Sequence, residues 1–302
     1  MSVIDLIRSK ENTAFSLELL PPLKGNNIEK LNETIDILKQ YDPLYINITN
    51  HKSDNCRRPC TVAIAAAIQK KYSIPVVPHV TCSGYTKEEM EYTLLDMQFL
   101  GITDLLLLRG DKKNDELIFK PLKGGCSHTL ELQHQINDFN NGSFLDGSDI
   151  RLDIHPYHYG VACYPEKHSE APDMDNDLYW LKKKVDAGAE YAVTQMFFDN
   201  DAYFKFVDKA EAVGITIPII PGIKPLDRLS QVTGIPRKFN VNFPPLLLEE
   251  LQKCENDETF REIGREWCIQ QCKELISFGV PSIHFYTMGK AEIVANVAKQ
   301  VF

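Results

Sequence analysis

The sequence predicts a single α/β domain over residues 1–302, folded as a (β/α)8 TIM barrel. Eight short apolar runs of strand length follow one another, mostly about 30 residues apart, as expected for successive βα units. Helical patterns lie between these runs. A doubly wound open sheet is the structural alternative, but no GxGxxG motif follows the first strand and the sequence contains no P-loop.

Several of the expected strands are apolar at consecutive positions, which is typical of a parallel sheet buried on both faces. The strands are FSLELL (15–20), LYINIT (44–49), PVVPHVTC (75–82), DLLLLRGD (104–111), GVACYP (160–165), YAVTQMFF (191–198), IPIIPGI (217–223) and SIHFYTM (282–288). Glu18 stands out in the first of them, because a carboxyl group is rarely buried without a partner.

The intervals between the strands carry helix signals. Four apolar residues after the first strand keep the 3, 4, 3 spacing of one helix face: Ile28, Leu31, Ile35 and Leu38. Thr86 and Glu89 form a capping-box pair at the start of another helix. Four helices are expected to end at a glycine just before a strand: Gly101, Gly188, Gly214 and Gly279. Two intervals are longer: one near 112–159 is loop-rich, and in the one near 224–281 we expect a pair of helices.

Composition and charge narrow the function classes. The formal charge of −9 argues against a general binder of nucleic acid or anionic membranes, and we expect neither as a partner. Residues 1–16 lack the apolar core of a signal peptide, and no apolar run reaches the roughly 18 residues of a membrane-spanning helix, so we expect a cytoplasmic protein. Two cysteine pairs have i, i+4 spacing, Cys56 with Cys60 and Cys268 with Cys272. We interpret them as reduced thiols, with a metal site as the alternative.

Polar residues gather where the predicted strands end, which is where barrels of this kind carry their active sites. These residues are Glu18, Thr49, His79, Thr81, Arg109, Asp111, Tyr164, Glu166, Gln195, the Pro221-Gly222 turn, Tyr286 and Thr287. Individual members have structural alternatives: Asp111 as a helix cap, Arg109 in an ion pair, His79 as a core histidine. The joint pattern favours a functional site.

The set of polar residues at the strand ends is poor in metal ligands, and we predict no bound metal. The histidines that could be assembled into a site lack HxH or HExxH spacing: His51, His79, His155 and His158. His155 and His158 are expected to be loop residues. The sequence has no GxSxG nucleophile elbow. What remains is a carboxylate-centred site with room for a large ligand, which suits acid–base chemistry or a bound cofactor.

Motifs along nearly the whole chain resemble those of methylenetetrahydrofolate reductases. FSLELLPP is similar to the FSFEFFPP signature that opens the catalytic barrel of that family. The agreement continues in family order through PHVTC (78–82), LLLRGD (106–111), ACYPEKHSEA (162–171), LKKKVDAGAEYAVTQMFFD (181–199), IIPGIKP (219–225) and IHFYT (283–287). The resemblance implies an FAD-dependent oxidoreductase of one-carbon metabolism. It would reduce 5,10-methylenetetrahydrofolate to 5-methyltetrahydrofolate with NADH or NADPH and so feed methionine synthesis.

The resemblance also implies roles for individual residues. Those that would contact FAD are Thr49, His79, Arg109, Gly110, Asp111, Thr129, Tyr164, His168, Asp177, Lys183 and Lys184. Those that would bind the folate are Glu18, Asp111, Gln195, Gln231, Tyr286 and Lys290. Glu18 would be the catalytic acid that protonates the leaving nitrogen of the imidazolidine ring, since burial in an apolar strand helps a carboxyl keep its proton. Asp111 would tune the electrostatics of the charged intermediate.

Four positions depart from the family pattern: Asn50, Trp180, Ile235 and Lys290. The chain stops after the last expected barrel helix, so we expect no regulatory domain. Two other classes remain open, namely a different barrel enzyme such as a metal-assisted hydrolase or lyase, and a non-catalytic ligand-binding barrel. The choice between NADH and NADPH also remains open. A homo-oligomer is expected, as in bacterial relatives of this length.

Overall fold

The seventh predicted strand is split at Pro221, and its two halves close the barrel. The computed structural model describes residues 1–52, 58–112, 118–149 and 154–302, whose parallel strands form one sheet in the order β7-β6-β5-β4-β3-β2-β1-β9-β8. β7 pairs with β6 and β8 pairs with β9, so the ring is completed around Pro221. The predicted (β/α)8 barrel is confirmed.

The strands lie within or close to the predicted runs. They are β1 (Ala14–Leu19), β2 (Ile46–Ile48), β3 (Val76–Thr81), β4 (Asp104–Leu108), β5 (His158–Cys163), β6 (Tyr191–Thr194), β7 (Ile219–Ile220), β8 (Gly222–Ile223) and β9 (Ser282–Tyr286). β4 ends before Arg109, so Arg109 and Asp111 belong to the segment that follows the strand. β5 begins earlier than predicted, so the expectation that His158 is a loop residue is wrong, because it pairs in register with Asp104. His155 lies outside any strand, as predicted.

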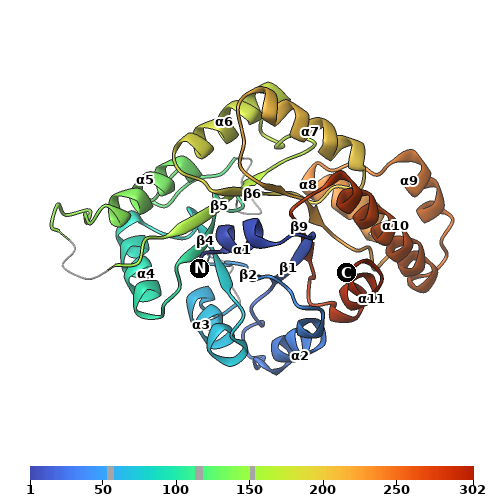
Figure 1. Ribbon diagram of the computed structural model, residues 1–302, viewed down its shortest axis with the longest axis horizontal. Coiled ribbons are helices and arrows are strands. Elements are labelled where there is room, and N and C mark those ends of the chain that lie inside the picture. Colours follow the sequence, from blue (N-terminus) through green and yellow to red (C-terminus); the bar gives the residue numbers. More distant parts are fainter. Residues whose placement is uncertain (53–57, 113–117, 150–153) are drawn as a thin grey trace.

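Helices surround the sheet (Figure 1). They are α1 (Val3–Ser9), α2 (Glu29–Leu38), α3 (Thr61–Tyr72), α4 (Lys87–Phe99), α5 (Thr129–Asn140), α6 (Met174–Asp186), α7 (Asn200–Ala212), α8 (Gln231–Phe239), α9 (Pro245–Gln252), α10 (Asp257–Phe278) and α11 (Ala291–Val301), with a 3-10 turn at Lys39–Tyr41. The Thr86–Glu89 capping box forms at the start of α4. The predicted helix-ending glycines all have positive φ, between 67° at Gly101 and 108° at Gly188.

The interval near 224–281 holds three helices rather than the predicted pair. Asn240 ends α8 in the left-handed conformation, and Pro245 occupies the first position of α9, where its missing N–H costs nothing. Asn256 then caps α10 by accepting from the backbone N–H groups of Glu258 and Thr259. These local signals divide the segment into three helices.

The strands alternate between a helix-facing and an interior-facing set of side chains. Leu17 and Leu19 of β1 and Ile46 and Ile48 of β2 are almost fully buried in the cluster that packs beneath the surrounding helices. Burial of each such side chain contributes about 1.5–3 kcal/mol to the stability of the fold. Because side chains alternate along a strand, the intervening residues face the barrel interior. Glu18 is one of these inward-facing residues.

Helix α1, which the sequence did not predict, closes the barrel at the amino ends of its strands. Its residues Val3, Ile4 and Ile7 pack against interior side chains such as Tyr45 and Leu106. In Figure 1, α1 lies across the centre of the ring. These apolar contacts seal the amino end of the barrel.

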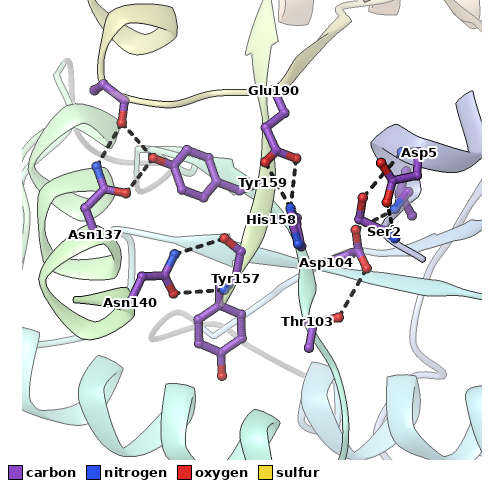
Figure 2. A network of polar contacts seen from close by, with 12 residues as sticks. Ser2, Asp5, Thr103, Asp104, Asn137, Asn140, Tyr157, His158, Tyr159 and Glu190 are labelled. Atoms are coloured by element: carbon purple, nitrogen blue, oxygen red, sulfur yellow. Dashed lines mark hydrogen bonds and ion pairs between the residues drawn. The ribbon is translucent and has the colours of Figure 1, made fainter. Parts of the chain in front are cut away.

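A polar network ties α1 to the sheet (Figure 2). The carboxylate of Asp104 accepts a 2.7 Å hydrogen bond from the backbone N–H of Val3, and Ser2 and Asp5 cap the helix reciprocally. Burial raises the pKa of Asp104, although the bond from Val3 opposes that shift. Farther along the same network, Nδ1 of His158 lies 2.9 Å from the Glu190 carboxylate.

The cysteines provide no sign of a metal site in the described part of the chain. Cys268 and Cys272 are buried on α10, where their mutual hydrogen bond and burial raise the pKa of the Cys272 thiol. Cys60 is exposed, and its predicted neighbour Cys56 lies outside the described residues. Within the described ranges, no group of three or more His, Cys, Asp or Glu side chains is arranged to hold a metal ion. Nor do those ranges include a helix with the length and apolar character needed to span a bilayer.

Candidate active site at the carboxyl ends of the strands

Glu18 lies near the carboxyl end of β1, between two neighbouring strands. It is in register with Asn47 on β2 and with Tyr286 on β9. Only 13% of its side chain is exposed. Burial raises the pKa of Glu18 to about 8, and the nearby Lys224 cation opposes part of that shift. The Glu18 carboxyl therefore holds its proton at neutral pH, as a general acid must.

His79 of β3 faces Glu18 across the barrel interior. Its Nε2 atom lies 3.6 Å from Oε2 of Glu18. Burial, with smaller contributions from His284 and His51, lowers the pKa of His79 to about 3. Both groups are therefore neutral at pH 7, so their approach is a contact between neutral groups and not an ion pair. A neutral His79 leaves the proton on Glu18.

Tyr286 packs over the break between β7 and β8. Its hydroxyl donates a 2.6 Å hydrogen bond to the carbonyl of Thr194, at the end of β6. Its ring covers Gly222, where an added Cβ would meet ring carbon Cε2 at 2.6 Å and the Thr194 carbonyl oxygen at 2.4 Å. Only glycine fits beneath this ring. Gln195 follows Thr194, and its backbone N–H donates to the Cys163 carbonyl at 2.8 Å.

The predicted FAD contacts Tyr164, His168 and Asp177 come together beyond β5. The Tyr164 and His168 rings lie 4.7 Å apart, and Asp177 of α6 accepts a 2.8 Å hydrogen bond from the His168 backbone N–H. Beside them, both terminal nitrogens of Arg109 contact the Glu170 carboxylate, at 2.6 and 2.7 Å. Glu170 was not singled out from the sequence, although it belongs to the ACYPEKHSEA motif.

Gly110 and Thr49 occupy tightly constrained positions at the same end of the barrel. Gly110 has a φ of +85°, and an added Cβ would meet Cβ of Ser83 at 2.6 Å. Glycine is thus required for both conformation and space. The Thr49 hydroxyl lies 2.9 Å from Nε2 of His51. Asp111 follows Gly110 and is exposed to solvent.

Three of the residues predicted to bind FAD lie outside the two groups just described. Lys184 is partly buried, and its ammonium group donates to the Ala162 carbonyl at 2.9 Å. Lys183 is exposed and lies beside the Tyr179 ring, while Thr129 is the first residue of α5. Within the described ranges, no hydrogen bond or ion pair joins Lys183 or Thr129 to the Arg109–Glu170 pair.

Asp227 joins two predicted folate-binding residues. Its buried carboxylate accepts a 2.6 Å hydrogen bond from Nε2 of Gln231 and lies 3.7 Å from Nζ of Lys290. Sequence reasoning missed both Asp227 and Lys224. Lys224 belongs to the IIPGIKP motif but was not singled out, and Asp227 follows β8 without a motif that marks its role. The departing residue Ile235 is buried in an apolar cluster with Phe198 and Phe243.

The other two residues that depart from the family pattern, Asn50 and Trp180, make different contacts. Asn50 donates to the His79 carbonyl at 3.2 Å, so it supports the strand that carries His79. Trp180 on α6 is 49% exposed, and its ring stacks with His128 at a centroid distance of 6.4 Å.

Comparison with known sequences places the whole chain in one family. The family model described as methylenetetrahydrofolate reductase matches residues 3–301. The chain is 34% identical to the 5,10-methylenetetrahydrofolate reductase of Buchnera aphidicola, over 96% of this chain and 91% of that protein. It is 31% identical to the Salmonella typhimurium enzyme of the same name, over 92% and 87%.

Longer relatives and a solved structure complete the comparison. Methylenetetrahydrofolate reductase (NADH) 1 of Arabidopsis thaliana is 31% identical over 95% of this chain but only 48% of its own length, so the chain spans about half of that relative. An uncharacterized protein from Clostridium thermocellum, described as binding two copies of 5-methyl-5,6,7,8-tetrahydrofolic acid, matches 99% of this chain and 98% of its own with a TM-score of 0.64. At 16% identity, this likeness shows a shared fold.

Proposed function

The chain belongs to the methylenetetrahydrofolate reductase family, and from that premise we propose that it reduces 5,10-methylenetetrahydrofolate to 5-methyltetrahydrofolate with NADH or NADPH and FAD. The observation that carries the proposal is the placement of Glu18. It is a buried carboxyl at the ligand-accessible end of a barrel, with a pKa of about 8 and a neutral histidine beside it. Ring opening of the folate needs an acid that is protonated at neutral pH.

The residues beyond β4 and β5 fit a dinucleotide cofactor. Arg109 already holds two carboxylate oxygens of Glu170 in a fork, and the same geometry suits two oxygens of a pyrophosphate. Gly110 keeps the backbone there free of a side chain that would block close approach. Tyr164, His168 and Asp177 would complete the binding surface with Thr49, His79 and Asp111. FAD would supply the hydride carrier between the nicotinamide and the folate.

Lys184 is assigned an indirect role in this proposal. Its ammonium group is bound to the Ala162 carbonyl of β5, so it would support the strand that carries Tyr164 rather than contact a phosphate. Lys183 and Thr129, at the ends of α6 and α5, would contact the outer part of the dinucleotide.

Folate binding would use the side chains around Glu18. Gln195 and Tyr286 lie at the ends of β6 and β9, and Gln231 and Lys290 are held together by Asp227. With the ring held there, the Glu18 O–H would protonate the leaving nitrogen, and the C–N bond electrons would remain on that nitrogen. Exposed Asp111 would offset the positive charge that develops on the substrate.

The test separates the two half-reactions. In Glu18→Gln, we expect folate reduction to fall by at least about 100-fold, because general acid catalysis contributes on that scale. NAD(P)H oxidation with menadione as acceptor should persist, since that half-reaction needs no acid at Glu18. Glu190→Gln is the control: Glu190 is a partly buried barrel carboxyl outside the candidate site, and it lies 2.9 Å from Nδ1 of His158. Full folate reduction by Glu18→Gln would contradict the assigned role.

Two measurements distinguish the other classes. A flavin absorbance spectrum in the purified protein supports the reductase and opposes a metal-assisted hydrolase or lyase. Absence of any NAD(P)H–menadione turnover, even with added FAD, would favour a ligand-binding barrel. Parallel reduction assays with NADH and NADPH identify the coenzyme, and sedimentation tests the expected homo-oligomer.

A further inference from the structure

The barrel interior level with and below Glu18 contains buried polar side chains. Ser16, Asn47 and His284 have no exposed surface. The Ser16 hydroxyl and Nδ1 of His284 share a 2.8 Å hydrogen bond. In contrast, neither Nδ2 nor Oδ1 of Asn47 has a hydrogen-bond partner among the described residues, and the same is true of Nε2 of His284. Both the donor and the acceptor of the Asn47 side chain are therefore buried without a hydrogen-bond partner in those ranges.

Such an amide is costly. Leaving a buried donor or acceptor unpaired costs roughly 1–3 kcal/mol per group, and folded proteins satisfy nearly all of them. An apolar side chain at position 47 would avoid that cost, as Val77 does at the paired position of β3. The amide thus indicates a partner other than a neighbouring side chain, and polar interior sites of this kind usually hold ordered water.

The register of the sheet directs Asn47 toward Glu18. The two residues are paired on adjacent strands β1 and β2. Their sequence neighbours Leu17, Leu19, Ile46 and Ile48 face the helices, so Glu18 and Asn47 both project into the interior. Side chains at paired positions of neighbouring strands lie close enough for one water to bridge them.

None of the other groups facing Glu18 makes a direct hydrogen bond to its carboxyl in the described ranges. Nε2 of His79 lies 3.6 Å from the carboxyl, beyond hydrogen-bond distance. The Tyr286 hydroxyl is already donated to the Thr194 carbonyl. Lys224 acts on Glu18 as a charge from the segment after β8. Nε2 of His79 and the amide of Asn47 both lack a hydrogen-bond partner in the described ranges. A neutral imidazole nitrogen offers either one N–H or one lone pair, whereas the Asn47 amide always offers two N–H donors.

We propose that Asn47 is a positioning residue for Glu18, with its Nδ2–H donating through one internal water to the carbonyl oxygen of the protonated carboxyl. With that oxygen fixed, the remaining O–H points to the open end of the barrel. This inference rests on the proposed function for its purpose. When Glu18 transfers its proton to the folate nitrogen, the same N–H group stabilises the carboxylate that is left.

The test reads the carboxyl group directly, by infrared spectroscopy of the full-length purified protein without folate or NAD(P)H. The difference spectrum against Glu18→Gln assigns the C=O stretching band of protonated Glu18. In Asn47→Leu, loss of the donor should move this band to higher frequency, and Asn47→Ser should return it toward the wild-type position. Ser282→Ala is the matched control. Ser282, on β9, is buried like Asn47, and its hydroxyl has no hydrogen-bond partner in the described ranges. Asn47→Val carries the same test if the leucine variant does not fold.

Folate reduction supplies a second readout. Asn47→Leu should lower it roughly 10- to 100-fold, in line with loss of a well-oriented proton donor. In the pH–rate profile of folate reduction, the decrease in rate at alkaline pH should also move to higher pH. Loss of the donor to the carboxylate raises the pKa of Glu18. An unmoved carboxyl band in both Asn47→Leu and Asn47→Val overturns the inference even if folate is reduced. A shifted band in a protein that reduces no folate supports the positioning and contradicts the proposed function, so the two failures are distinguishable.

Discussion

Oε2 of Glu18 lies 3.6 Å from Nε2 of His79, and burial keeps both side chains neutral at pH 7. At a similar spacing on the surface, the same residues would exchange a proton and form an ion pair. Here the interior disfavours both charged forms, since it raises the pKa of one group and lowers that of the other. The proton is retained by the residue that the proposed chemistry requires to donate it.

Lys224 limits how far the Glu18 pKa rises. Because a nearby cation favours the carboxylate, replacing it by an apolar residue should raise the Glu18 pKa further. We therefore expect Lys224→Met to shift the alkaline limb of folate reduction to higher pH. Lys205→Met is the control, since Lys205 is an exposed residue of α7 that pairs only loosely with Asp201. A limb that stays in place, or moves to lower pH, would show that Lys224 does not act on Glu18.

Buried His284 should make the fold sensitive to acid. Burial lowers its pKa from 6.5 to about 3, so the unfolded chain binds a proton there that the folded protein excludes. The stabilisation is present above pH 6.5 and is lost as the pH falls toward 3, by up to about 1.4 kcal/mol per pH unit. Urea unfolding of His284→Gln between pH 7 and pH 4.5 should show a shallower loss than the wild type. Equal slopes would contradict this account.

Gly222 should tolerate no side chain. A methyl group there would lie 2.4 Å from the Thr194 carbonyl oxygen and 2.6 Å from the Tyr286 ring, so one of them must move. We expect Gly222→Ala to lower the free energy of unfolding by about 1–3 kcal/mol. Gly234→Ala in α8 is the control, because no neighbouring atom lies within 4 Å of its added Cβ, and it should raise that free energy by about 0.5–1 kcal/mol. Chemical denaturation measures both, and a neutral Gly222→Ala would refute the predicted clash.

Much of the fold was predictable because local signals and tertiary structure agree. Apolar runs marked the strands, and the Thr86–Glu89 capping box and the helix-ending glycines marked helix boundaries. Helix α1 was missed because it is short, and its role depends on apolar contacts with the sealed barrel end. The split into α8 and α9 was not predicted, because Asn240 was not read as a helix end or Pro245 as a helix start.

The candidate site was predictable where a motif marks a strand end and obscure where neighbours decide the role. Glu18 was conspicuous as a carboxyl within an apolar run. Asp227 and Glu170 become meaningful only once the fold brings Lys290 and Arg109 beside them. Asn47 gave no signal, because an asparagine in a strand looks ordinary until its register with Glu18 is known. The inward turn of Lys184 to the Ala162 carbonyl likewise depends on packing.

The pH dependence of single-turnover folate reduction tests the central claim most directly. With the flavin reduced beforehand, the rate should be constant at neutral pH and fall as Glu18 loses its proton, with an apparent pKa of about 8. Glu18→Gln should abolish this limb together with most of the rate, while Glu190→Gln should keep both. A limb near the ordinary carboxyl pKa of 4.5, or one that survives in Glu18→Gln, would contradict Glu18 as the proton donor.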